Sequence, residues 1–172
     1  MKKTMTKDTI PEGFTVPMAL MDALPVLFFA GTGILLGMIV KSLFVEVCAA
    51  VMFLSGALKV IWKLIAAVQK KNIWPLFVQM RIAMPLGLLG VIAGLFFSAF
   101  TGAGSLSGAV HAVFHLPQGL FFLAGFIGMG LMIRCAKKLD SSDPKSNWIE
   151  QGINSAAQGC IFLGLLMVYL GK

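Results

Sequence analysis

Charged side chains are scarce in this 172-residue chain, and acidic ones are the scarcest. Asp and Glu together number 7, all charged residues make up 12% of the sequence, and 58% of the residues are apolar. A soluble domain needs a more polar exterior than so few charged groups can supply. The mean hydropathy of +0.90 agrees with this. The composition excludes an ordinary soluble globular protein and favours one whose surface faces a lipid bilayer.

The chain also lacks the short motifs of common catalytic and cofactor sites. It contains no HExxH pair, nucleophile elbow, P-loop, dinucleotide fingerprint or pair of catalytic acids. Its three cysteines, Cys48, Cys135 and Cys160, form no CxxC pair, and their odd number argues against a disulfide framework. These absences favour a protein that is not an enzyme, and they indicate no particular cofactor.

Long apolar stretches dominate what is present. A helix that crosses a bilayer needs about 20 mostly apolar residues. Five stretches meet this length, and short polar connections separate them. We therefore predict an all-α integral membrane bundle of five transmembrane helices, with residues 1–16 as a short cytoplasmic tail and residues 17–172 as a single transmembrane domain. The predicted spans cover about 18–40, 43–68, 82–100, 117–135 and 149–170.

The basic residues predict the orientation of these helices. Twelve of the 14 Lys and Arg residues fall on one side, and only Lys41 and Lys172 fall on the other. Because cytoplasmic loops carry the excess of Lys and Arg, we predict the N-terminus inside and the C-terminus outside. Trp62, Trp74 and Trp148 are expected at the inner headgroup level. The net charge of +7 is thus an orientation signal, and it does not indicate a nucleic-acid partner.

The lipid bilayer is the one partner that the sequence predicts directly. The Met-Lys-Lys start and the absence of an organellar targeting sequence favour the plasma membrane, in particular the inner membrane of a prokaryotic cell. The sequence leaves open whether the chain works alone, as a homo-oligomer or within a larger membrane complex.

Glycines and prolines interrupt the spans at regular places. Glycine pairs four residues apart let helix backbones approach closely, and we favour packing within the chain over dimerisation as their use. Proline at the first turn of a helix removes no hydrogen bond that the helix needs, so Pro25 and Pro85 are expected near helix starts. The glycine pairs are Gly33-xxx-Gly37 and Gly90-xxx-Gly94.

Depth along the helices predicts two ion pairs near the cytoplasmic boundary. Asp22 and Lys59 lie nearly the same number of residues from the turn at Lys41, so their side chains are expected at similar depth. Arg134 and Glu150 flank the last polar loop symmetrically and are expected to be level too. Ionisable groups within spans need such partners, and for each pair a structural role is favoured.

Polar residues recur along the fifth span. Glu150, Asn154 and Gln158 are four residues apart, with Gln151 and Ser155 beside them, which places them on one helix face. The stripe reaches about 12 Å inward from the cytoplasmic end. Lipid cannot satisfy these groups, so they must face other helices or water. Two interpretations stay open, namely hydrogen bonds that hold helices together and a hydrated cavity or ligand site.

Four further polar residues are candidates for a ligand site or pathway. Gln79 and Arg81 stand near the start of the third span, and Arg81 is either an anchor at the membrane surface or the cationic member of an inner-side site. Arg81 or Arg134 is expected near the polar stripe of the fifth span. Glu46 lies just past the outer turn, where a pairing with Lys41 is favoured over a role in proton or cation binding.

The two histidines form the weakest candidate site. His111 and His115 lie four residues apart, and two such imidazoles can share a metal ion or ligate haem. No carboxylate or Cys lies nearby in the sequence to complete a zinc site. Two interfacial histidines on a short amphipathic turn are therefore the favoured interpretation.

The sequence supports three functional hypotheses. The first is a small-solute or ion transporter or channel, or a membrane subunit of a transport complex, with a polar cavity lined by the fifth span. The second is a membrane-embedded metal- or haem-binding enzyme or redox protein that uses His111 and His115. The third is a non-catalytic membrane assembly partner whose polar residues only join helices. We favour transport because of the polar stripe, the glycine-thinned helices and the small amount of chain outside the spans.

Overall fold

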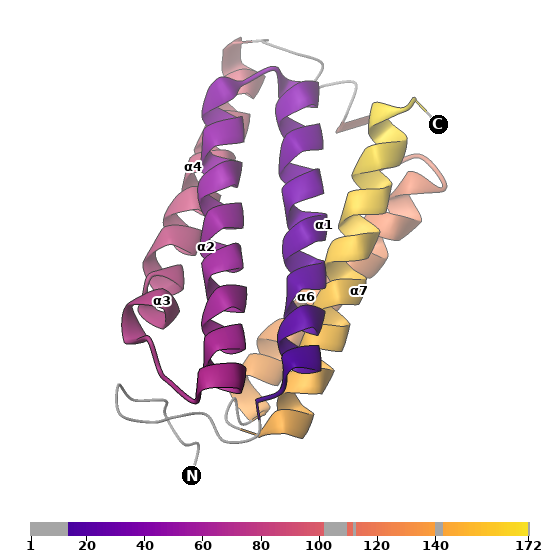
Figure 1. Cartoon of the computed structure of the whole chain (residues 1–172). Helices are drawn as coiled ribbons and strands as arrows, with labels where there is room; N and C mark the ends of the chain where they lie inside the picture. The colour runs from indigo at the N-terminus through magenta and orange to yellow at the C-terminus, as the bar shows by residue number, and fades with distance from the viewer. Residues whose placement is uncertain (1–13, 102–109, 112, 140–142, 172) are drawn as a thin grey trace.

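The computed structural model (Figure 1) describes residues 14–101, 110–111, 113–139 and 143–171. Within these ranges the chain is helical and contains no strand, and five helices are long and apolar enough to cross a membrane. The prediction of an all-α chain with five such helices is confirmed. The helices are α1 (Val16–Val40), α2 (Leu43–Gln69), α3 (Trp74–Val78), α4 (Met80–Thr101), α6 (Gln118–Lys138) and α7 (Pro144–Tyr169).

The boundaries differ from the predicted ones mainly at α7, which begins several residues earlier than expected. Asp143 caps this helix: its carboxylate accepts hydrogen bonds from the backbone N–H of Ser146 at 2.9 Å and from the Ser146 hydroxyl at 2.7 Å. Pro144 follows at the first helical position, where proline is favoured. The first turn is polar, so hydropathy alone did not include it in the span.

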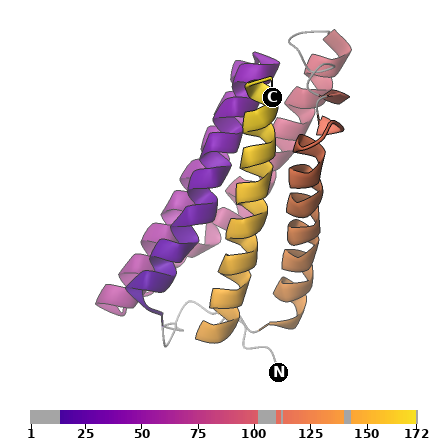
Figure 2. The same ribbon diagram turned by 90° about the vertical axis from the view of Figure 1, so that its right-hand side faces the viewer.

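The long helices pack as a row in the order α4, α2, α1, α7, α6. The row is bent, because α4 and α6 both lie behind the front formed by α1, α2 and α7 in Figure 1, and Figure 2 shows α6 beside α7 from the edge. The arrangement is an arch, with α1 at its centre between α2 and α7. The start of α1 and the end of α7 lie at opposite ends of the molecule, as an odd number of antiparallel long helices requires.

The helices approach closely wherever glycine faces a neighbour. A Cβ on Gly33 would stand 2.7 Å from the Cβ of Ala49, and one on Gly94 would stand 2.6 Å from a methyl group of Val45. Both glycine pairs predicted from the sequence are thus used within the chain, where they seat α1 and α4 against α2. Close packing of this kind holds helices together where lipid provides no hydrophobic drive for association.

The expected positions of two prolines were wrong. Pro25 lies inside α1, because Thr15 caps that helix and it begins at Val16; Pro85 likewise lies inside α4. A proline inside a helix leaves the carbonyl four residues earlier without its usual N–H donor. Pro25 therefore frees the carbonyl oxygen of Met21.

Trp62 is buried between helices. It is 1% exposed and packs against Phe14 and Phe77, and its indole N–H donates to the Asn72 side chain at 3.0 Å. It is a core residue that joins the segment before α1 to α2 and α3, so its ring faces protein. Trp148, by contrast, is 43% exposed.

Two glycines on α6 allow the close-packing interpretation to be tested. A Cβ on Gly128 would meet the Cβ of Ala157 at 2.7 Å, whereas a Cβ on Gly130 would meet nothing within 4 Å. We expect Gly128→Ala to lower the free energy of unfolding in detergent by about 1–3 kcal/mol, because α6 and α7 must separate. Gly130→Ala is the matched control and should be neutral or stabilising by up to about 1 kcal/mol. Equal effects of the two substitutions would contradict this packing.

The predicted orientation is tested by labelling single cysteines. In a variant with Cys48, Cys135 and Cys160 replaced by Ala, a new cysteine is placed at Lys138 or at Gly171. We expect a membrane-impermeant maleimide to label Gly171→Cys in intact cells and Lys138→Cys only after permeabilisation, because Lys and Arg are retained on the cytoplasmic side. Labelling of both positions from the same side would show that the orientation or the number of crossings is wrong.

Candidate functional site

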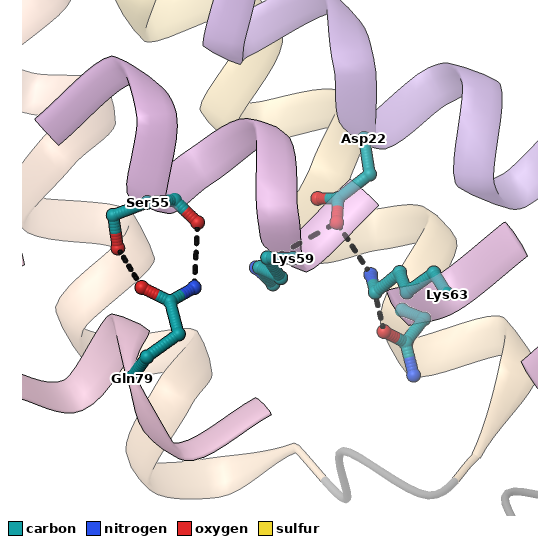
Figure 3. A network of polar contacts seen from close by, with 6 residues as sticks. Asp22, Ser55, Lys59, Lys63 and Gln79 are labelled. Carbon is teal, nitrogen blue, oxygen red and sulfur yellow. Dashed lines mark hydrogen bonds and ion pairs between the residues drawn. The ribbon is translucent and has the colours of Figure 1, made fainter. Parts of the chain in front are cut away.

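A buried ion pair joins α1 to α2 near the end of the arch where α1 begins. Lys63 Nζ lies 3.0 Å from Asp22 Oδ2, and the two residues are 3% and 2% exposed. Lys59, one turn away on the same face of α2, places its Nζ 3.7 Å from the same oxygen. Figure 3 shows the carboxylate of Asp22 between the two lysines. The contacts are ion pairs without the alignment of good hydrogen bonds.

The two lysines are held unequally. The Lys63 side chain is 4% exposed, whereas that of Lys59 is 25% exposed and lies farther from Asp22. Lys59 is the partner that depth counting predicts, and the structure does place it beside Asp22. The closer partner, Lys63, was not predicted, because counting residues from a turn gives depth and not rotation about the helix axis. The i,i+4 spacing of the two lysines was the available signal.

Asn147 connects this pair to α7. Lys63 Nζ donates to Asn147 Oδ1 at 3.5 Å, and Asn147 Nδ2 donates to the backbone carbonyl of Asp143 at 3.3 Å. Lys63 Nζ also lies 5.6 Å from the centre of the Phe14 ring. We refer to Asp22, Lys59, Lys63 and Asn147 as the charged cluster. It brings together three of the five long helices.

Charge balance explains how the charged cluster can be buried. A lone ammonium or carboxylate among apolar helices is costly, and the cost falls when the two are paired and hydrogen-bonded. The members in direct contact comprise two lysines and one aspartate, so they carry an excess of one positive charge. Glu150 lies on the next turn of α7 after Asn147, so a further carboxylate stands near that end of the cluster. The direct pairing of Lys63 with Asp22 and the partial exposure of Lys59 lower the cost of burying these charges.

A second buried polar surface continues from Asn147 along the same face of α7. Gln151 and Ser155 are 4% and 8% exposed. In the described part of the chain, Gln151 Oε1 and Ser155 Oγ have no hydrogen-bond partner, although each atom is fully buried. Buried polar atoms are almost always paired with protein or with water. These two groups are therefore buried polar groups that still lack a partner, one and two turns along α7 from Asn147 of the charged cluster.

The predicted stripe of Glu150, Asn154 and Gln158 is half-buried. Gln158 Nε2 lies 3.6 Å from the sulfur of Met129 on α6, which is a weak acceptor. The most buried polar stripe of α7 is thus Asn147, Gln151 and Ser155, one residue along from the expected set. Among Asn147, Gln151 and Ser155, the sequence predicted Gln151 as a site candidate. Asn147 was missed because it lies in the polar first turn that was assigned to a loop.

The structure separates the third-span candidates from α7. Two hydrogen bonds of 3.0 Å join Gln79 to Ser55 (Figure 3). The Ser55 hydroxyl donates to Gln79 Oε1, and Gln79 Nε2 donates to the backbone carbonyl of Ser55. Arg81 is exposed and stacks 4.9 Å from the centre of the Phe77 ring. Both lie on the α2–α3–α4 side of the arch, whereas α7 packs against α1 and α6. Their contacts are those of groups that fasten the start of α4.

The remaining candidates lie apart from the charged cluster. Arg134 is exposed, and no direct ion pair joins it to Glu150 in the described residues. His111 and His115 are both exposed, and over the ranges that the structure describes no group of three His, Cys, Asp or Glu side chains could hold a metal ion. Glu46 folds over Gly37 of α1 at the opposite end of the hairpin.

Unequal burial predicts unequal contributions of the two lysines to stability. We expect Lys63→Met to lower the free energy of unfolding in mixed micelles by about 3 kcal/mol, because it leaves Asp22 buried with only a distant partner. Lys59→Met should cost about 1 kcal/mol or less, because this lysine is partly exposed. Chemical unfolding of the two variants side by side measures the difference. A cost for Lys59→Met as large as that for Lys63→Met would contradict the geometry.

Comparisons with known proteins give no relative from which a role could be transferred: no family model, no curated protein and no solved structure matches this chain.

Proposed function

We propose that this chain is a polytopic membrane protein that conducts or transports a small polar solute or an ion, alone or as a subunit of a transport complex. The proposal is supported chiefly by one observation: fully buried acceptor and hydroxyl groups without partners, on Gln151 and Ser155, adjoin the charged cluster. Five apolar helices are compatible with a polytopic membrane protein, and the transport role is our inference from the polar groups between them.

Ionisable residues inside membrane helices are rare and usually serve a pathway, a relay or a ligand. Polar side chains that only join helices need just enough partners to satisfy one another, as Gln79 and Ser55 do. The α1–α7 interface is different, because Gln151 Oε1 and Ser155 Oγ remain unpaired beside a charged pair. An unpaired buried group costs free energy, and water or a solute can remove that cost by binding.

The charged cluster offers a solute two kinds of contact. An anionic group can replace Asp22 as the partner of Lys59, which is the more exposed and more distant of the two lysines. A hydrogen-bond donor can bind Gln151 Oε1. Pro25 also leaves the backbone carbonyl of Met21, next to Asp22 on α1, without its helical N–H donor. Breaking and restoring the Asp22–Lys59 contact is the smallest rearrangement that would admit a solute.

Reconstitution into liposomes tests this function. Osmotic swelling reports the entry of small neutral solutes, and currents on a solid-supported membrane report chloride, acetate, sodium, potassium and protons. We expect at least one probe to cross faster than in protein-free liposomes, and Asp22→Asn or Gln151→Leu to abolish that difference. Arg134→Gln and Ala156→Leu, at exposed positions on α6 and α7, are the controls and should retain it. Variants are compared only if they elute as the wild type does in size exclusion.

The predicted stripe is tested in the same liposomes. If Asn154 and Gln158 only join helices, replacing either by Leu should change stability by about 1 kcal/mol and leave the transport of the probe unchanged. If they line the path, the same substitutions should abolish transport in a protein that still folds. Absence of transport of every probe by the wild type would contradict an autonomous transporter and favour a non-catalytic assembly role.

A further inference from the structure

A groove lies between α1 and α2 on the opposite side of α2 from α4. Its volume is about 430 Å³, within the usual range for ligand sites. Ala30, Gly33 and Met38 of α1 line one side, and Glu46, Ala50 and Phe53 of α2 line the other. The groove is separate from the charged cluster, which lies at the other end of the same two helices.

Small side chains create this groove. At Gly33 the α1 backbone comes so close to Ala49 that an added Cβ would stand 2.7 Å from the Cβ of Ala49. Ala30 and Ala50 are also small and form the floor of the groove with Gly33, while the larger side chains of Met38 and Phe53 form its apolar walls. In a bilayer, an open groove of this kind faces lipid, because α2 turns a different face, with Cys48 and Met52, toward α4.

Glu46 lines one end of the groove, and Lys41 lies in the helix turn next to that end. Glu46 is the one charged residue among those that line it, and its side chain folds over Gly37 instead of reaching Lys41. Lys41 is exposed at the turn that joins α1 to α2. No ion pair joins these two residues within the ranges that the structure describes, so the favoured sequence interpretation of a Lys41–Glu46 pair is not realised there. Both charges are available to a ligand.

We propose that the groove binds one phospholipid that carries a primary amine in its headgroup. One acyl chain lies along Ala30, Gly33 and Ala50, the ammonium group donates hydrogen bonds to Glu46, and the phosphate lies near Lys41. A zwitterionic headgroup matches the two charges. Lipid chains are already in contact with the groove from the bilayer, so selectivity comes from the headgroup, where the contacts are charge-assisted. A choline headgroup cannot donate hydrogen bonds, and a glycerol headgroup presents no positive charge to Glu46.

Native mass spectrometry of the purified protein tests the proposal. The protein is released from micelles after incubation with equal amounts of phosphatidylethanolamine, phosphatidylcholine and phosphatidylglycerol that carry the same acyl chains. We expect one phosphatidylethanolamine molecule to be retained about tenfold more than either competitor, which is the preference that one charge-assisted contact provides. Glu46→Gln should remove the preference, and Ala50→Leu, which fills the groove, should reduce retention of all three lipids.

Ala156→Leu provides the matched control, because it adds the same volume at an exposed alanine of α7 outside the groove. It should leave both retention and preference unchanged. Equal retention of the three lipids by the wild type, or a preference that survives Glu46→Gln, would overturn the proposal. A dimer that Ala50→Leu abolishes would overturn it too, since the groove would then seat a second copy of the chain. Thermal unfolding of each variant shows that any loss of lipid is not a loss of fold.

Discussion

A carboxylate that enters an apolar helix must find its partners inside the chain, and Asp22 shows how far that requirement extends. Its ion pair with Lys63 joins α1 to α2, and the contact of Lys63 with Asn147 extends the connection to α7. These are the three central helices of the arch, while α4 and α6 pack against its two ends. Lipid cannot satisfy any of these groups, so separating the helices would expose charges that have no alternative partner.

The same physics explains which features could be predicted from the sequence. Span number follows from the length of apolar stretches, and close approach at Gly33 and Gly94 follows from small residues at helical spacing. The depth of a side chain along its helix also follows from the sequence, by counting residues from the turn, and this count predicts Lys59 as the partner of Asp22. Rotation about a helix axis is not, because apolar residues surround these helices on all sides and mark no single buried face. Lys63 was missed for that reason.

The other differences arise at a helix end that is polar, because a hydropathy scan does not detect it. The first turn of α7 contains Pro144, Ser146 and Asn147, so a hydropathy scan ends before it, yet Asp143 caps it as the sequence pattern permits. Including that turn shifts the buried polar stripe by one position, from Asn154 and its neighbours to Asn147, Gln151 and Ser155. A one-residue shift rotates the stripe by roughly 100° and turns it from the α6 side toward α1.

The α1–α2 hairpin presents different chemistry at its two ends. Near the start of α1, Asp22 and Lys63 are enclosed by protein and Lys59 is partly exposed beside them, so their charges act on whatever enters between the helices. Near the turn, Glu46 and Lys41 lie at the edge of an open apolar groove, so their charges act on whatever reaches them from outside. The glycines that let α1 approach α2 also keep the groove open, because larger side chains at Gly33 and Gly37 would fill it or push the helices apart. Packing of the hairpin and access to its outer surface therefore depend on the same residues.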